Sequence, residues 1–195
     1  MPFNKLLLLF FLSTVLLFSR TTVGLNINTE DFEVEGAMDI TTFSEYVNGT
    51  MFIVDANFIN TEYDSLFGVG IGAHNSFQGM EGLSLGLGIK YVYVEDFMAL
   101  PLKAEASYGF LVTDNIPTVS LSAALLYAPS ALSFDEAKNY FEFRAEAEIE
   151  VISSVAVYVG YRDIEIEYLD SFSESLNNSF ETFNSSFYGG LKISF

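Results

Sequence analysis

Acidic residues at alternate positions are the side chains of this sequence that are spaced to do chemistry. Glu142, Glu146 and Glu148 follow one another along one stretch, with Arg144 among them. Two carboxylates on either side of a glycosidic bond can act as acid and base in its hydrolysis. The chain holds 26 acidic residues, however, so such pairs arise by chance. The spacing alone therefore predicts no hydrolase.

The other chemical signals are weaker. His74 is the only histidine, and a lone histidine is more often a hydrogen-bonded interior side chain than a general base or a metal ligand. Residues 68–72, Gly-Val-Gly-Ile-Gly, imitate part of a dinucleotide-binding fingerprint, but no helical segment follows to hold a pyrophosphate. The chain has no cysteine, which excludes disulfides and thiol chemistry. We expect no enzyme, no metal and no cofactor.

The elements that carry these residues alternate apolar and polar side chains. Residues 140–151 show the pattern most clearly, with Phe141, Phe143 and Ile149 on one face and the acids on the other. A period of two is typical of a β-strand with two different faces. The same alternation predicts ten strand segments: 25–29, 31–41, 50–60, 66–75, 83–94, 100–112, 119–127, 140–151, 155–168 and 187–195.

The composition favours strands that cross a membrane. Half of the residues are hydrophobic and the mean hydropathy is +0.33, yet beyond the N-terminus no run of 18 apolar residues occurs. Strands with one lipid-facing side produce such a sequence. The last segment ends on the aromatic residue Phe195, as the closing strand of an outer-membrane barrel does.

The fold predicted is all-β, a small up-and-down antiparallel transmembrane β-barrel of ten strands. Bacterial barrels have an even number of strands and both termini on one side, so eight strands are the alternative. Counted back from the last strand, loops 128–138 and 169–186 fall outside, while connections 47–49, 113–117 and 152–154 fall inside.

Two stretches depart from the simple pattern. Beyond Arg162 the apolar positions shift to Ile164, Ile166 and Tyr168, which indicates a β-bulge or a strand that has left the membrane. Residues 133–140 are the one stretch where a helix competes with a strand.

Residues 1–24 read as a signal peptide. Lys5 precedes about a dozen apolar residues, and small residues end at Gly24, where we expect cleavage. A retained N-terminal anchor is the alternative. Residues 25–195 then form one barrel domain, and the formal charge of −18 disfavours nucleic acid as a partner.

The charged faces of the strands identify the lumen, because a charge on the lipid face costs about 2–4 kcal/mol at the membrane midplane. Glu33, Glu35 and Asp55 lie on this polar side. We expect a structural lumen charge network of Lys90, Lys103, Glu105, Glu142, Arg144, Glu146, Glu148, Arg162 and Lys192. An ion path lined by acids is the alternative.

Aromatic residues on the opposite side predict an interfacial girdle. We place them at strand ends that reach the outer side of the membrane: Tyr91, Tyr93, Tyr108, Phe110, Tyr127 and Phe141.

Several motifs carry a family resemblance. Residues 127–134 (Tyr-Ala-Pro-Ser-Ala-Leu-Ser-Phe), residues 157–162 (Val-Tyr-Val-Gly-Tyr-Arg), the start at residues 25–28 and a final strand ending in Phe195 resemble the YfaZ family of bacterial outer-membrane proteins. The resemblance implies a small outer-membrane barrel without catalytic residues. By family analogy, Phe195 is an assembly signal for the barrel assembly machinery.

We therefore expect a monomer in the outer membrane of a diderm bacterium, in contact with lipid and lipopolysaccharide. Its role would be structural or a surface interaction, with a side-chain-filled lumen. The alternative is a narrow cation-preferring pore or small-solute channel. We also expect Mg²⁺ or Ca²⁺ to bridge outer acids and anionic headgroups; these acids are Asp135, Glu136, Asp170, Glu174 and Glu181.

Overall fold

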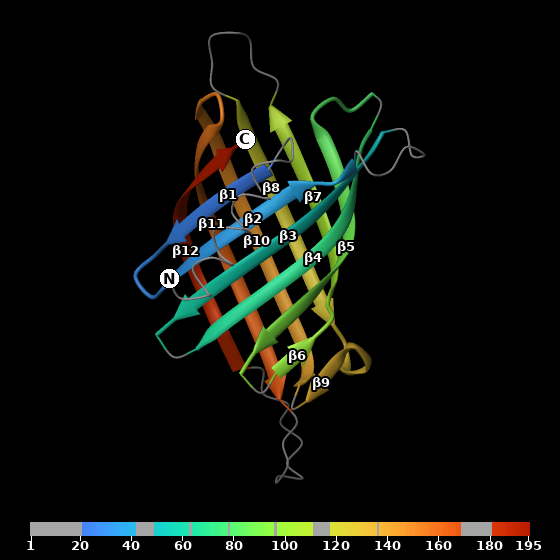
Figure 1. Ribbon diagram of the computed structural model, residues 1–195, viewed down its shortest axis with the longest axis vertical. Coiled ribbons are helices and arrows are strands. Elements are labelled where there is room, and N and C mark those ends of the chain that lie inside the picture. The colour runs from blue at the N-terminus through green and yellow to red at the C-terminus, as the bar shows by residue number, and fades with distance from the viewer. Residues whose placement is uncertain are drawn as a thin grey trace, which may run out of the picture.

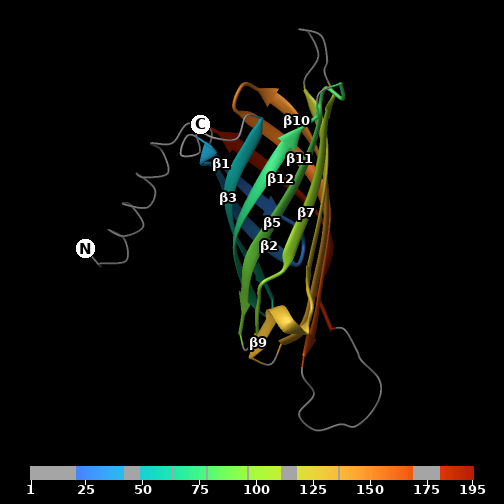
Figure 2. The same ribbon diagram turned by 90° about the vertical axis from the view of Figure 1, so that its right-hand side faces the viewer.

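Ten long antiparallel strands close into a barrel in the computed structural model of the protein (Figures 1 and 2). The structure describes residues 21–41, 49–62, 64–77, 79–95, 97–110, 118–135, 137–168 and 181–195. The long strands are β1 (Thr21–Ile27), β2 (Asp31–Asp39), β3 (Thr50–Thr61), β4 (Ser65–Ser76), β5 (Leu83–Val94), β7 (Leu102–Phe110), β8 (Val119–Ala128), β10 (Ala137–Ile152), β11 (Val155–Tyr168) and β12 (Glu181–Ser194). Short elements are β6 (Phe97–Ala99), the 3-10 turn η2 (Ser130–Leu132) and β9 (Ser133–Asp135).

Each long strand pairs with the next long strand along the chain, and β12 pairs with β1 to close the cylinder. The closing register aligns Thr22 with Ser194 and Ile27 with Gly189. The predicted ten-stranded up-and-down barrel is therefore confirmed, and the eight-stranded alternative is wrong. Among the described residues, no helix has the length and hydrophobicity needed to cross a membrane.

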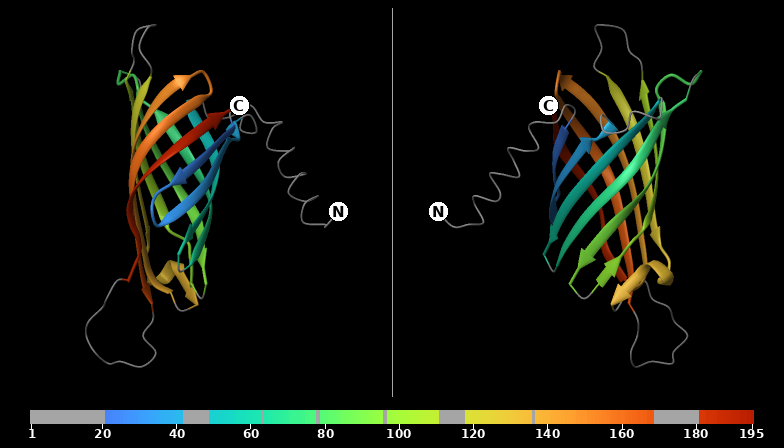
Figure 3. Two further views of the ribbon diagram at one scale, coloured as in Figure 1. Left: turned by 90° about the vertical axis from the view of Figure 1, so that its left-hand side faces the viewer. Right: turned by 45° about the vertical axis from the view of Figure 1, so that its right-hand side comes forward.

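The two ends of the barrel differ. Thr21 and Phe195 lie together at one end, which we call the terminal end, where the Phe195 backbone N–H donates to the Thr21 carbonyl over 2.9 Å. The turn at residues 153–154 joins strands at this end. The opposite end, called the far end, carries β6 and β9 (Figures 1 and 3). Strands on either side of residues 169–180 also end there, in agreement with the predicted parity of the loops.

Strand boundaries correct the sequence prediction in four places. β1 runs from Thr21 to Ile27, not over residues 25–29. β12 begins at Glu181, not at residue 187, because Asn184 and Ser186 point into the barrel and bond polar partners there. The helix considered for residues 133–140 is wrong, since β9 and the start of β10 occupy the described part of that stretch. β6 and β9 pair with each other within stretches that we had placed in or beside loops.

The shift of apolar residues in β11 is not a change of facing. Its even-numbered residues point inward from Ala156 through Arg162 to Ile166. Ile164 and Ile166 therefore face the barrel interior, and Asp163 and Glu165 face outward. Of the two predicted causes, a strand that extends beyond the apolar outer band fits. The irregularity in pairing lies across from Ile164, in β12.

The outer surface carries the apolar positions of the alternation, including Ile71, Leu87, Val159 and Phe187. Of the predicted aromatic girdle, Tyr91, Tyr93 and Tyr127 lie near the far end and face outward. Tyr108 and Phe110 face outward too, but β7 brings them to the terminal end, so their predicted side is wrong. Exposed aromatics thus occur near both ends.

The N-terminal strand bears on the predicted signal cleavage. Residues 1–20 lie outside the described residues. Thr22 to Gly24 pair on one side with Lys192 to Ser194 and on the other with Glu35 to Ala37. Cleavage after Gly24 would leave Leu25 to Ile27 as the remainder of β1.

Candidate functional site

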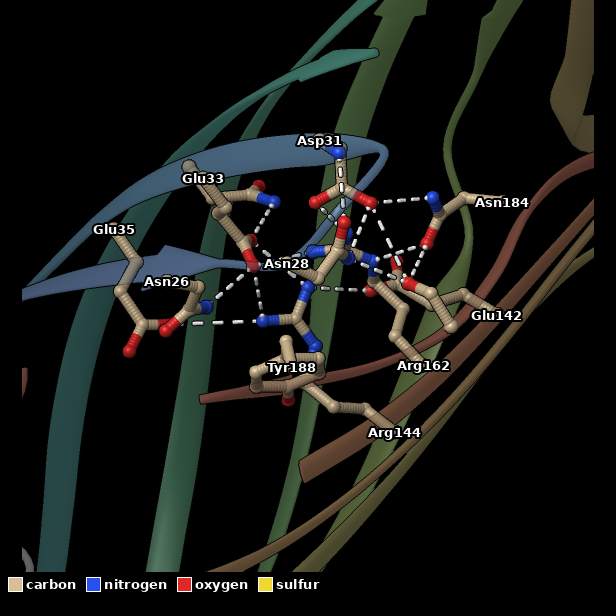
Figure 4. Close-up of polar contacts among 12 residues, drawn as sticks. Asn26, Asn28, Asp31, Glu33, Glu35, Glu142, Arg144, Arg162, Asn184 and Tyr188 are labelled. Atoms are coloured by element: carbon tan, nitrogen blue, oxygen red, sulfur yellow. Dashed lines mark hydrogen bonds and ion pairs between the residues drawn. The ribbon is translucent and has the colours of Figure 1, made fainter. Parts of the chain in front are cut away.

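The most deeply buried part of the lumen charge network surrounds Arg162 (Figure 4). Its Nη1 lies 2.6 Å from Glu33 Oε2, and its Nη2 lies 2.7 Å from Asp31 Oδ1. Its Nε donates to Asn184 Oδ1 over 3.0 Å. Arg162 and both carboxylate side chains are 0% exposed. Such a site is stable only because every partner is charged or hydrogen-bonded.

Arg144 connects this centre to a second buried acid, Glu142. Nη2 of Arg144 lies 2.9 Å from Glu33 Oε1 and 3.1 Å from Glu142 Oε1. Glu142 also accepts a hydrogen bond of 2.7 Å from the hydroxyl of Tyr140. Lys90 Nζ lies 3.9 Å from Glu142, which is beyond hydrogen-bond distance.

A separate group of charges lies on β3, β4 and β7. Lys103 Nζ lies 2.9 Å from both Asp55 and Glu105. The second oxygen of Glu105 lies 2.9 Å from His74 Nε2. His74 is therefore an interior hydrogen-bonding side chain beside a carboxylate. The described residues contain no group of three or more acidic, histidine or cysteine residues that could hold a metal ion.

The third group, near the terminal end, surrounds Lys192. Its Nζ lies 2.9 Å from Glu148, 3.6 Å from Glu146 and 3.9 Å from Glu35. The ammonium also lies 4.7 Å from the centre of the Tyr158 ring, within the range of a cation–π contact. The structure thus brings all nine residues of the proposed network into ion pairs. Glu35 also lies 3.5 Å from Nη1 of Arg144, so it connects the group around Lys192 to the one around Arg162.

Sequence reasoning missed the uncharged members. Asn26 and Asn57 each donate to Glu33 over 2.7 Å, and Tyr188 donates to Glu146 over 2.7 Å. The predicted network also left out Asp31, which pairs with Arg162. The alternation places all four on the inward face of their strands, and this parity is the signal that could have found them.

Small residues make room for these large side chains. A Cβ at Gly160 would lie 2.5–2.7 Å from ring atoms of Tyr188, so only glycine lets that ring cross the inner wall. The Tyr188 ring in turn lies 5.4 Å from the guanidinium carbon of Arg162. The glycines of the inner face are therefore part of the network's packing.

Apolar side chains fill the lumen at the far end, and we call this cluster the apolar plug. Its members are at most 3% exposed, and Phe97 packs against Tyr140 with ring centroids 6.0 Å apart. The sequence prediction of a lumen filled by charges did not include this layer. The apolar plug consists of Ile59, Leu66, Val92, Val94, Phe97, Ala99, Leu126, Ala128, Ala137, Tyr140, Ile164 and Ile166.

Toward the terminal end the lumen is hollow. A cavity of about 380 Å³, here called the terminal cavity, is lined by residues from all three groups of charges. Among its lining residues, side-chain exposure rises from 1% for Glu142 to 20% for Glu35. Water therefore reaches the network from the terminal end, and the apolar plug closes the opposite side.

The far end has a second, acidic recess of about 560 Å³ outside the apolar plug. Glu30, Glu62, Asp64 and Glu181 are among the residues that line it. Of the acids predicted to bridge headgroups through divalent ions, Glu181 lies here and Asp135 lies in β9. Glu136, Asp170 and Glu174 lie outside the described residues.

Phe195, the predicted assembly signal, ends the chain beside β1. Its side chain is 58% exposed, and its backbone bonds Thr21. Phe195 therefore lies at the closing seam of the barrel, beside the start of β1.

Comparisons with known proteins give a family and a group of structures. The family model described as "YfaZ precursor" matches residues 10–195. The chain is similar to the structure of the KdgM porin in complex with disordered oligogalacturonate, with 7% identity and a TM-score of 0.46, covering 90% of this chain and 99% of that one. The KdgM porin alone gives 11% identity and a TM-score of 0.41, with coverages of 90% and 99%. The NanC porin gives 8% and 0.40, with coverages of 89% and 98%. No curated protein sequence matches the chain.

Proposed function

The chain belongs to the YfaZ family, and from that premise we propose that it is an integral outer-membrane barrel whose lumen is closed by its own side chains. Its role is structural or a surface interaction, without catalysis. The observation that carries the proposal is the apolar plug, which fills the lumen beside a fully paired, buried ion cluster. A small barrel leaves little more than room for side chains.

The outer surface supports placement in a membrane. Large apolar residues on every long strand are exposed, including Val69, Leu85, Leu125 and Leu191. The bases of the lumen charge network face inward. A soluble protein of this size rarely exposes so much contiguous apolar surface. The expected neighbours are outer-membrane lipid and lipopolysaccharide, around a monomer.

Planar-bilayer recording tests the closed lumen. We expect silent bilayers for the unaltered protein and conductance steps after Phe97→Ala combined with Ile164→Ala, because both side chains belong to the apolar plug. Phe187→Ala is the matched control, since Phe187 is 80% exposed on the outer face and should leave bilayers silent. Reproducible conductance of the unaltered protein would contradict the proposal.

A narrow cation-preferring pore is the second candidate, and the terminal cavity is the observation that favours it. Eight lumen carboxylates face five lumen bases in the described ion pairs, which would attract cations. Conduction would require the apolar plug to open. Cation-selective steps that change on Glu146→Gln would establish this function in place of the first.

Catalysis finds no support in the site. Carboxylates such as Glu105 and Glu142 are engaged by bases at 2.9–3.1 Å rather than held ready for a substrate.

The role of Phe195 in recognition by the barrel assembly machinery is tested by deleting it. We expect less folded barrel in the outer membrane, with the same amount of exported chain. Unchanged assembly would remove this part of the proposal.

A further inference from the structure

A buried amide oxygen and a buried ammonium lie at the inner end of the terminal cavity. In the described structure the oxygen has no hydrogen-bond partner, and the carboxylate near the ammonium is beyond hydrogen-bond distance. Asn57 is 6% exposed, and its Nδ2 donates to Glu33 over 2.7 Å. Its Oδ1 is buried and has no partner in the described structure. Lys90 is also 6% exposed, and the one carboxylate near its Nζ in the described part of the chain is Glu142 at 3.9 Å. Both residues line the terminal cavity.

The two groups meet above a single residue of β4, Gly68. Gly68 pairs with Asn57 on one side, and Lys90 comes from β5 on the other side. A Cβ at Gly68 would overlap Asn57 Oδ1 and would lie 2.5 Å from Lys90 Cε and 3.3 Å from Lys90 Nζ. Glycine therefore lets an amide oxygen and an ammonium approach the same point of the lumen.

The pair defines the chemistry of an occupant. The Lys90 ammonium can only donate hydrogen bonds, and Asn57 Oδ1 can only accept them. A single group placed between them must accept one hydrogen bond and donate another, which a hydroxyl does. Neither a cation nor an anion suits both groups. Because buried polar groups are rarely left unpaired, an occupant that satisfies both would be retained there.

The rest of the terminal cavity also favours an uncharged occupant. Its lining has five carboxylates and four bases, so the charges nearly balance. Ser107 and Ser122 add hydroxyl groups to the wall. The volume of about 380 Å³ lies in the range of small-molecule sites, roughly 300–1,000 Å³. The apolar plug closes the far side, so entry is from the terminal end.

We infer that the terminal cavity is a binding site for a small, neutral, polyhydroxylated solute, whose innermost hydroxyl accepts from Lys90 Nζ and donates to Asn57 Oδ1. The site is a blind pocket in the barrel, and it needs no conduction and no opening of the apolar plug. It goes beyond the proposed function, and its binding can be measured on the folded barrel in detergent whether or not the barrel conducts.

Saturation-transfer NMR with xylitol as the probe tests this site on the barrel refolded in deuterated detergent. We expect transfer to xylitol that saturates with concentration. Lys90→Met keeps the apolar stem and removes the donor, and it should weaken binding at least tenfold. Gly68→Ala should do the same by filling the meeting point. Gly189→Ala is the control, because a Cβ there has its nearest neighbour at an ordinary 3.8 Å.

Heat-modifiable gel mobility must first show that each variant is folded. Absence of transfer in the unaltered protein would mean that water alone occupies the site, and this would overturn the inference. Equal binding by the unaltered protein and by folded Lys90→Met would overturn it too. If glycine displaces xylitol at a lower concentration than glycerol does, the site binds zwitterions rather than neutral polyhydroxylated solutes, and the inference is overturned.

Discussion

Replacing Arg162 by methionine should destabilise the barrel by about 3–5 kcal/mol, the cost of breaking a buried ion pair by removing one partner. The substitution removes the donors to Glu33, Asp31 and Asn184 at 2.6, 2.7 and 3.0 Å. Glu33 keeps Arg144 at 2.9 Å, whereas Asp31 keeps only uncharged donors. Most of the lost stability therefore comes from Asp31, whose carboxylate is 0% exposed and would be left without a cationic partner.

A second substitution separates charge from packing. Asp31→Asn in the Arg162→Met background removes the stranded charge, and we expect it to restore about half of the lost stability. Arg144→Met provides the comparison. Arg144 is 13% exposed beside the terminal cavity. Without it, Glu33 would keep Arg162 at 2.6 Å, and Glu142 would keep the Tyr140 hydroxyl at 2.7 Å and the more distant Lys90 at 3.9 Å. Its loss should be smaller, about 1.5–3 kcal/mol, as for hydrogen bonds to charged groups.

Urea unfolding in lipid vesicles, followed by far-UV circular dichroism because the chain has no tryptophan, measures these values. The reasoning would be refuted by equal losses for the two arginine variants. It would also be refuted if the changes in the free energy of unfolding caused by the Arg162 and Asp31 substitutions were additive within about 0.5 kcal/mol, as they are for independent sites.

Five further outcomes are expected. A nitroxide at Ile149, which is exposed on the outer face, should be relaxed by a lipid-soluble reagent, and one at Glu146 should not; the reverse would invert the facing of β10. Ile149→Arg should cost up to about 2–4 kcal/mol near the midplane, with no rescue by lumen substitutions. Ser154→Gly should stabilise the tight turn by roughly 0.5–1 kcal/mol, because Ser154 has φ +80°, and an unchanged urea midpoint would count against this. A chelator should lower thermal stability in lipopolysaccharide-containing membranes, through the acidic far end; equal melting with and without it would contradict the bridging. Mass spectrometry of the mature protein should show cleavage after Gly24, and a mature chain that begins earlier would retain more of β1.

The strand order was predictable because one physical rule, alternation, acts in every segment. Tyr140 to Val151 can be a two-faced strand in any barrel, so its facing follows from sequence alone. Which side chains form ion pairs with one another across the lumen cannot be deduced from the sequence alone. Arg162 meets Asp31 over 131 residues of chain, and this contact depends on the stagger of β2 against β11 in the closed cylinder.

The apolar plug illustrates a signal that was present but was not used. Val92, Leu126 and Ile164 share the inward parity of Lys90, Ala124 and Arg162 in their own strands. For Ile164 the apolar character instead suggested a shifted apolar face, because a change of lumen chemistry along the barrel axis is not visible within one strand. It emerges only when several strands place their far ends together.

The seam between β1 and β12 has a consequence for the order in which the protein folds. Hairpins such as that of β10 and β11 join neighbouring segments, but the cylinder needs a pairing between residues 22–27 and 189–194. Contacts of such separation form slowly, since the chain entropy is lost before the contact forms. Arg162, Asp31 and Asn184 likewise come together only when both extremities are present. A chain that lacks its last strand can form most of its hairpins and still leave its buried charges in water. The pairing of β12 with β1 therefore completes the fold, and until it forms the charges of Arg162 and Asp31 stay exposed to water.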